Sequence, residues 1–279
     1  MLHVICYMKI LFFGDIVGQS GRQALKEILP ELKKELAPDL TLVNGENSAA
    51  GLGFSQKTVE EILAAGVDWL TSGDHTFDVK EAATLLEDKK WPLVRPLNWP
   101  GDVPGRGWET ITVGAKKILL VALAGRVFMR QNFDDPFPRI KELLEDYSLK
   151  GAKQGSEAVD AILIDFHAEA TSEKGAMAWF LDGQVSAVLG THTHVPTADE
   201  KILPGGTAFI SDLGMVGPKD SVLGMAPDIV IKRLLTQRQI KMETASGPLT
   251  EVNGVFLEID DQTGLAKKIE RVRREIALV

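Results

Sequence analysis

The sequence predicts an α/β protein in which helices lie outside two mixed β-sheets that pack face to face. Apolar runs alternate with helix-period patterns along its 279 residues, a rhythm typical of parallel strands joined by right-handed helical crossovers. About ten or more strands are expected, and open sheets of that size tend to split into two packed sheets. An apolar fraction of 44% and a charged fraction of 25% are ordinary for a globular protein with such a core.

The first third of the chain alternates strand and helix patterns. Ser20 begins a capping-box pattern for a helix after the first strand, and Pro30 should kink or split that helix. Ser55 and Gly66 are expected to begin and end a second helix, and Asp78 a third. The strands expected here are 8–15, 39–43 and 67–71.

The remaining two thirds predict further strands, helices and a terminal hairpin. Apolar and polar periodicity, with Pro and Gly as punctuation, defines these elements. We expect strands within 109–125 joined at 114–116, strands 159–165 and 185–190, helices 138–147, 172–183 and 226–237, a strand and Gly-rich loop within 207–217, and a hairpin with its turn at 260–264. Without a repeat or linker, residues 1–279 are expected to form one domain, with 1–7 as an N-terminal extension.

Polar side chains end several of the expected strands. VLGTHTHVP, residues 188–196, places His192 and His194 two positions apart, so that both imidazoles point to one side of an extended segment. On its own, such a pair would more often be two solvated loop histidines than metal ligands. Four of the five histidines, however, stand at strand ends together with carboxylates and an amide. The strand-end residues are Asp15, Glu46, Asn47, Asp74, His75, His167, His192 and His194.

This residue set predicts a metal centre. Loops at the carboxyl ends of parallel strands line one crevice, where ligands bind. Carboxylate, amide and imidazole ligands without thiolate suit Mn, Fe or Zn better than an all-oxygen Ca or Mg site. The candidates are too many for one ion, and fit two ions about 3.5 to 4 Å apart.

Composition excludes several other classes of function. A net charge of −8 argues against broad binding to nucleic acid or anionic membranes, because those partners need a positive field. Cys6 is the single cysteine, which excludes an internal disulfide and favours a cytoplasmic protein. The apolar run 118–125 is too short to span a bilayer, and residues 1–13 lack the cleavage site of a signal peptide.

Other enzyme motifs are absent or weak. The sequence contains neither GxSxG nor GxxxxGK[ST], and the glycines of GDIVGQSG lack dinucleotide spacing and could equally serve a sharp turn. Glu169 and Glu173 could suggest a glycosidase pair, but carboxylates at a helix start usually serve the helix dipole.

The motifs GDIVG, NGEN, GDH, DFHAE and GTHTH resemble the motif series of the calcineurin-like metallophosphoesterase superfamily. More narrowly, the chain is similar to the bacterial YmdB-like subgroup of metal-dependent 2′,3′-cyclic nucleotide phosphodiesterases, from Met8 almost to the C-terminus. RPLNWPG, HAEATSEK, GTHTHVPTAD, SDLGMVGP and DDQTG extend the likeness. The resemblance implies a four-layer α/β/β/α sandwich of two mixed sheets, which agrees with the architecture expected from the alternation.

The resemblance also implies roles for the strand-end residues. It implies two divalent or trivalent transition-metal ions, Fe or Mn, with Zn as an alternative. One ion is expected to bind Asp15, Glu46, Asn47 and His194, and the other Glu46, Asp74, His167 and His192, with Glu46 bridging. Hydroxide generated there would attack phosphorus in line, and His75 would protonate the departing ribose oxygen. Alternatively, His75 is a buried structural histidine.

The sequence departs from the superfamily pattern at two positions. Val17 stands where the first motif usually carries a histidine ligand, and Asn47 could replace that ligand. Asp74 stands where GNH has asparagine, and it adds negative charge to a site that must attract phosphate. Three aspartates are candidates for orienting the ligand imidazoles: Asp165, Asp199 and Asp212.

Two alternatives to a phosphodiesterase are kept open. The same metals could serve a phosphomonoesterase or protein phosphatase, or the fold could be a regulatory or RNA-processing scaffold with little turnover. The expected partner is a small phosphoester, with a cyclic nucleotide favoured. We expect neither membrane binding nor stable nucleic-acid binding, and the sequence leaves homo-oligomerisation open.

Overall fold

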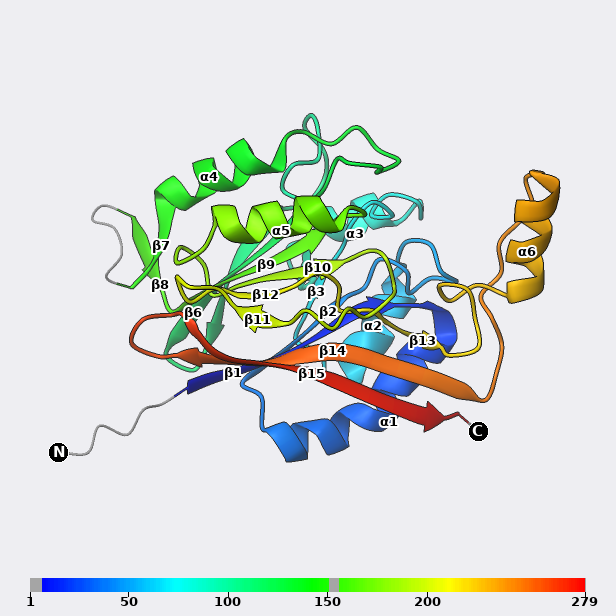
Figure 1. The fold of residues 1–279 in the computed structure, drawn as a ribbon, viewed down its shortest axis with the longest axis horizontal. Coiled ribbons are helices and arrows are strands. Elements are labelled where there is room, and N and C mark those ends of the chain that lie inside the picture. Colours follow the sequence, from blue (N-terminus) through cyan, green and yellow to red (C-terminus); the bar gives the residue numbers. More distant parts are fainter. Residues whose placement is uncertain (1–6, 151–155, 279) are drawn as a thin grey trace.

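Two large mixed sheets lie one on the other in the computed structural model, which describes residues 7–150 and 156–278 (Figure 1). The first sheet contains, in spatial order, β15 (Ala266–Ala277), β14 (Leu249–Asp260), β13 (Met215–Pro218), β1 (Tyr7–Ile16), β2 (Leu40–Asn44), β3 (Trp69–Thr71) and β4 (Leu93–Val94). The second contains β11 (Lys201–Ile202), β12 (Ala208–Ile210), β10 (Ala187–Thr191), β9 (Ala161–His167), β6 (Lys116–Ala124) and β5 (Trp108–Val113). A small pair, β7 (Tyr147–Leu149) and β8 (Glu157–Val159), stands apart.

Helices cover the outer faces of both sheets. The helices of the described residues are α1 (Gly18–Leu36), α2 (Gln56–Ala64), α3 (Ala82–Glu87), α4 (Pro136–Asp146), α5 (Thr171–Phe180) and α6 (Pro227–Thr236). Figure 1 shows α4 and α5 over the second sheet and α1 beneath the first, whereas α6 projects from the body and has no buried residue. Within the described part of the chain, no helix is both long and apolar enough to cross a bilayer.

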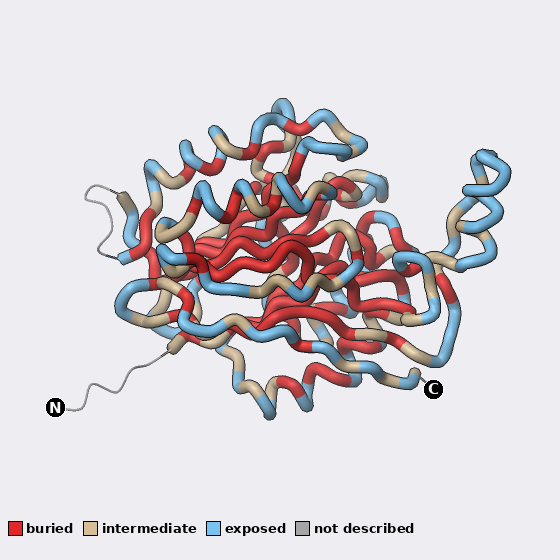
Figure 2. The backbone as a smooth tube through the Cα atoms, viewed as in Figure 1, coloured by how far each residue is buried: buried red, intermediate tan, exposed pale blue. Residues whose placement is uncertain are grey.

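Three apolar layers confirm the predicted four-layer α/β/β/α sandwich. In β1, Ile10 and Phe12 pack into the layer between the sheets, while Leu11 and Phe13 pack on the opposite face with α1 and α2. This alternation follows from the two-residue period of a strand. Residues of β9 and β10 complete the central layer, and a third layer lies beneath α4 and α5. The strands accordingly form the buried centre in Figure 2.

Much of the predicted element order is confirmed. Ser55 caps α2 by accepting a hydrogen bond from the Thr58 amide, and Gly66 after its end has φ 104°. β5 and β6 form the expected antiparallel pair, as do β14 and β15 around the expected turn. The helices predicted at 138–147, 172–183 and 226–237 correspond to α4, α5 and α6, each with ends shifted by one to three residues.

Four expectations about local structure were wrong. α1 begins at Gly18 after an N-cap at Val17, so Ser20 lies inside the helix and does not cap it. α1 also continues without a break through Pro30, so the split expected as one of two outcomes is absent. The third helix begins only at Ala82, because Asp78 instead pairs with His75.

The fourth concerns the expected Gly-rich loop, whose residues from Met215 form β13, which pairs with β1 in the middle of the first sheet. The short strands β4, β7, β8 and β11 were also not predicted. Of the expected extension 1–7, residues 1–6 lie outside the described residues, and Tyr7 already belongs to β1.

The strand directions bring particular chain segments to one end of the sandwich. β1, β2 and β3 run parallel in the first sheet, and β9 and β10 run parallel in the second. Each of these strands is followed by one of the polar segments predicted to carry the site, or contains part of it.

Candidate metal centre

The two sheets contribute different ligand types to one place. From the first sheet come a residue of β1 and the residues that follow β2 and β3, all carboxylates or amides: Asp15, Glu46, Asn47 and Asp74. From the second come the last residue of β9 and two residues after β10, all imidazoles: His167, His192 and His194. All but His192 are at most 9% exposed, so these polar groups are buried where the sheets meet.

Four of these residues form a tight cluster. One ligand atom each from Glu46, Asp74, His167 and His192 lies within 4.8 Å of all the others. His167 Nε2 is 2.9 Å from Glu46 Oε1 and 3.2 Å from Asp74 Oδ1, and His192 Nδ1 is 3.0 Å from His167 Nε2. These four residues are the set expected to hold one of the two ions. Two imidazoles and two carboxylates converging on one point match the mixed nitrogen and oxygen ligation of a transition metal.

The residues expected to hold the other ion are more loosely arranged. Asp15 Oδ1 is 3.8 Å from His194 Nε2 and 3.9 Å from His167 Nδ1. Asp15 Oδ1 and Asn47 Oδ1 are both buried without a hydrogen-bond partner. A buried oxygen without a donor is costly, and a cation is the partner that such an oxygen lacks. The residues present therefore fit metal ions.

The backbone is locally strained where the side chains converge. His192 and His194 adopt φ values of 99° and 65°, which non-glycine residues seldom occupy and which cluster at functional sites. Gly73, before Asp74, has to be glycine, because a Cβ there would lie 2.1 Å from His167 Cδ2. The GDH motif thus lets the loop after β3 pass directly against the imidazole of the other sheet.

A buried hydrogen-bond network fixes the orientation of His167. Its Nδ1 lies 2.9 Å from Thr191 Oγ1, and Thr191 donates to Asp165 Oδ1 at 2.6 Å. Asp165 also accepts hydrogen bonds from Asn44 and Thr71, which belong to the first sheet. The network therefore ties the two sheets together and leaves His167 Nε2 facing the cluster.

The electrostatics of the cluster favour positive charge. Burial opposes protonation of His167, but the charge of Glu46 and the hydrogen bond to Asp74 outweigh it and hold the pKa of this imidazole well above its usual range. Burial also disfavours the Asp74 carboxylate, yet its bonds to His167 and His192 hold the pKa of Asp74 well below its usual range. Burial raises the pKa of Asp165 to about 6. A metal cation would supply the positive charge that the carboxylates of the cluster attract.

His75 lies beside the cluster without joining the four. Its amide donates to Glu46 Oε2 at 3.2 Å, and its Nδ1 is 2.7 Å from Asp78 Oδ2. Asp78 is held in turn by Arg130, whose Nη2 is 3.1 Å from the same oxygen. The His75 side chain is 20% exposed, which argues against a fully buried structural role. With Nδ1 engaged by Asp78, Nε2 is the nitrogen that remains for a ligand.

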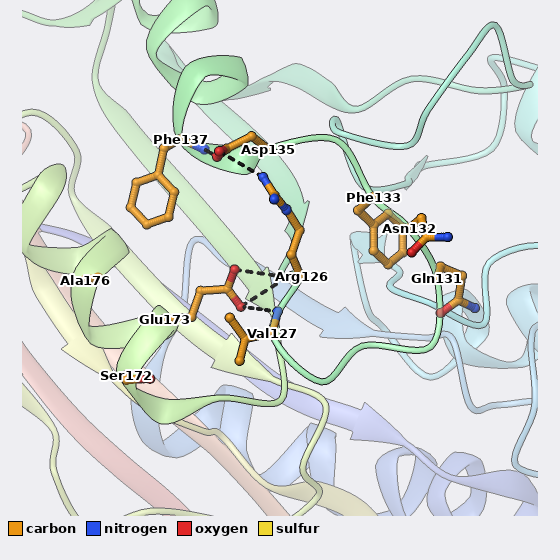
Figure 3. Close-up of a pocket in the computed structure, with 10 residues that line it drawn as sticks. All are labelled: Arg126, Val127, Gln131, Asn132, Phe133, Asp135, Phe137, Ser172, Glu173 and Ala176. Atoms are coloured by element: carbon orange, nitrogen blue, oxygen red, sulfur yellow. Dashed lines mark hydrogen bonds and ion pairs between the residues drawn. The ribbon is translucent and has the colours of Figure 1, made fainter.

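Two pockets adjoin the strand ends. The site pocket, of about 270 Å³, is lined by Glu46, Asn47, Gly51, Leu52, His75, Glu169, His192, Thr193, His194, Leu223 and Met225. A larger outer pocket, of about 760 Å³, lies between the loop after β6 and the start of α5 (Figure 3). Glu169, just before α5, lines the site pocket, and Glu173, in the first turn of α5, lines the outer pocket.

Of the three aspartates expected to orient imidazoles, Asp165 acts on one, and it reaches His167 through Thr191. Asp199 accepts hydrogen bonds from Thr197 and Ser211. Asp212 pairs with Lys174 at 2.7 Å. In the described structure none of them bonds directly to a candidate ligand imidazole.

Sequence reasoning missed a further contact in the site. Glu169 Oε2 lies 3.1 Å from His192 Nε2, on the side of the ring opposite the cluster nitrogen. A carboxylate that holds the outer nitrogen of a ligand histidine orients the ring and raises its basicity. Glu169 follows His167 by two residues, so the sequence placed it next to an expected ligand. The proximity of Glu169 to His192, however, depends on the pairing of β9 with β10.

The chain matches the family model of YmdB-like proteins over residues 11–272. It is 44% identical over 265 residues to the 2′,3′-cyclic-nucleotide 2′-phosphodiesterase of Bacillus subtilis, over 95% of this chain and 96% of that one.

Two crystal structures resemble the whole fold. One, described as a novel phosphatase from Mycoplasma pneumoniae, has a TM-score of 0.89 at 36% identity and covers 98% of this chain and 95% of that one. The other, a hypothetical protein from Thermus thermophilus, has a TM-score of 0.86 at 39% identity and covers 96% and 100% respectively.

Proposed function

Since the chain belongs to the YmdB-like family of calcineurin-like metallophosphoesterases, we propose that it is a metal-dependent phosphodiesterase that hydrolyses 2′,3′-cyclic nucleotides. The observation that carries the proposal is the buried cluster of Glu46, Asp74, His167 and His192 at the junction of the sheets. The Bacillus subtilis relative, similar over nearly its whole length, acts on this substrate class by its name.

Two transition-metal ions are the proposed cofactors, with Mn, Fe and Zn as the candidates that this ligand set suits. Glu46, Asp74, His167 and His192 would hold one ion, and Asp15, Asn47 and His194, together with Glu46, would hold the other. Bound there, the ions would supply Lewis acidity to the phosphoryl group and an activated water. The partnerless oxygens of Asp15 and Asn47 support the second position.

His75 is the proposed general acid. Hydrolysis of the cyclic ester breaks one bond from phosphorus to a ribose oxygen, and that oxygen needs a proton as it leaves. His75 lines the site pocket, and Asp78 occupies its Nδ1, so Nε2 is the nitrogen that can donate.

Glu169 and the network behind His167 have a supporting role in this proposal. Glu169 holds the outer nitrogen of His192, and Thr191 with Asp165 holds that of His167. Both rings are therefore oriented before substrate arrives, which lowers the reorganisation that catalysis requires.

A comparison of substrates tests the proposal. Protein loaded separately with Mn, Fe or Zn would be assayed with a 2′,3′-cyclic nucleotide, an acyclic diester and a phosphomonoester. We expect the highest kcat/KM for the cyclic nucleotide. A clear preference for the monoester would indicate a phosphatase instead, and no turnover of any ester with any metal would contradict a hydrolase.

A further inference from the structure

The loop that follows β6 has an unusual composition for a protein of net charge −8. Residues 126–130 read RVFMR, an aromatic side chain flanked by two arginines. Glu173 fixes the start of this segment, because its carboxylate accepts hydrogen bonds from the amides of Arg126 at 2.9 Å and Val127 at 3.2 Å (Figure 3). The Arg126 guanidinium pairs with Asp135 at 2.9 Å.

The other end of the segment is fastened to the candidate site. Arg130 contacts Asp78, the residue that holds His75. Gln131 donates from Nε2 to the carbonyl oxygen of Asp74 at 2.6 Å. The loop is thus anchored directly to the segment that supplies a proposed ligand and the proposed acid.

Phe128 stands between these anchors and projects into solvent. It is 86% exposed, the largest fraction among the exposed large apolar side chains of the described residues. Its φ of 63° lies in the left-handed region, which costs free energy for a non-glycine residue. Anchors on both sides hold this conformation, so the exposed ring is presented by a fixed backbone.

Phe128 belongs to a loop that contacts the segment supplying Asp74 and His75. It lies two residues from Arg130, whose side chain contacts Asp78, and two residues span at most about 7 Å. A nucleotide whose phosphate lies at the cluster has to place its base outside the buried ligands, towards the loops that surround them. An exposed aromatic face at that position suits a nucleobase, since every base has a π-face that stacks on such rings.

We propose that Phe128 is a specificity-determining residue that stacks on the nucleobase of the substrate, with residues 126–131 as the base-recognition loop. The inference rests on the proposed function, and adds to it which part of the substrate is recognised and by what. Arg126 and Arg130 are paired with Asp135 and Asp78, so the loop offers the substrate an aromatic ring rather than unpaired positive charge.

A matched pair of substrates tests the stacking role. One is adenosine 2′,3′-cyclic phosphate, and the other is methyl riboside 2,3-cyclic phosphate, which has the same reacting ring and no base. For Phe128→Ala we expect the ratio of kcat/KM between the first and the second to fall about 5- to 150-fold, the range that stacking on one aromatic ring implies. Phe128→Trp should keep or raise the ratio.

A control variant separates stacking from general effects of removing an aromatic ring. Trp179 on α5 is 59% exposed and has no place in the proposed site. Trp179→Ala should leave the ratio as in the wild type. An unchanged ratio in Phe128→Ala would overturn the inference. If that variant kept the ratio and sedimented as a different oligomer, Phe128 would instead serve contact between copies of the chain.

Failure of the proposed function gives a different result. If the wild-type protein hydrolyses neither cyclic ester, that function fails, and the loop is judged by calorimetric titration with adenosine 3′-monophosphate. Weaker binding of this nucleotide by Phe128→Ala than by Trp179→Ala would support base recognition. Equal binding, or no binding by either variant and the wild type, would overturn it.

Discussion

The two sheets of this protein end in chemically different edges. The first sheet supplies oxygen atoms, from Asp15, Glu46, Asn47 and Asp74, whereas the second supplies the nitrogen atoms of three histidines. Each edge alone would be a poor metal site. Three buried carboxylates without cations repel one another, and imidazoles alone bring no negative charge to balance a cation.

The metal centre is therefore a product of sheet packing. The two edges meet only because the central apolar layer, with Phe12 from the first sheet and Leu163 and Leu189 from the second, holds the sheets together. Asp165 strengthens the junction, since it belongs to the second sheet and accepts hydrogen bonds from two residues of the first. Changes on either edge should therefore have distinct consequences.

The largest effect is expected from removing a nitrogen of the second edge. His192→Ala should lose metal and reduce the rate by about 10⁴-fold or more, because the Lewis-acid contribution of the ions disappears with them. His194→Ala should behave alike. Metal content by elemental analysis, near two ions in the wild type and lower in the variants, measured alongside the rate, checks this.

The same experiment needs evidence that the variants remain folded. Val195→Ala changes an exposed side chain of the same loop and should keep wild-type metal content and rate. Circular dichroism should be alike for all variants. Wild-type protein with one ion or none, after growth with ample Mn and Fe, would contradict the two-metal proposal.

Sequence reasoning reached this edge-to-edge arrangement only partly. The carboxyl ends of parallel strands share an edge, so Asp15, Glu46 and Asp74 could be expected together, as could His167 with His192. The sequence did not show which sheet each strand belongs to. β6 and β9, for example, pair in the second sheet although other elements separate them along the chain.

The supporting residues were harder to predict for the same reason. Thr191 and Asn44 look like ordinary strand residues in the sequence, and their contacts with His167 and Asp165 join segments more than 20 residues apart. Ser20 shows the opposite failure. Its local capping pattern predicted that the helix begins there, but α1 begins earlier, at Gly18, whose φ of 59° a glycine adopts readily. Local patterns were reliable where tertiary contacts agreed with them, as at Ser55.

The second prediction concerns His75, the imidazole that comes from the oxygen-supplying sheet. It lies outside the cluster of four, and so His75→Ala should retain metal while losing about 10²- to 10⁴-fold in rate, the usual contribution of a general acid. The loss should shrink for a nitrophenolate ester, whose leaving group needs no proton. Rates of the wild type and His75→Ala would be measured with a cyclic nucleotide and with the nitrophenolate ester. An equal loss of rate on both esters would mean that His75 has another role.

The smallest effect is expected at Asp74, the first-sheet carboxylate that contacts two imidazoles of the second sheet. Its Oδ1 lies 3.2 Å from His167 Nε2 and 3.4 Å from His192 Nδ1, and these contacts keep it ionised. With Asp15 and Glu46 it places three carboxylates in the site, one more than an asparagine at this position would leave. The added charge offsets part of the attraction between metal ions and an anionic phosphate.

We therefore expect Asp74→Asn to keep metal while lowering KM for anionic substrates a few-fold. One unit charge at about 4 Å and an effective dielectric of about 20 amounts to about 4 kcal/mol, of which ligation and screening leave a fraction. An amide keeps one oxygen for the ion and removes the charge, so affinity for the metal should fall while affinity for the phosphate rises. Metal titration of the wild type and Asp74→Asn measures the affinity for the metal, and steady-state kinetics measures KM for the anionic substrate. If both affinities are unchanged, carboxylate and amide are interchangeable at this position, and the charge of the first edge has no influence on substrate binding.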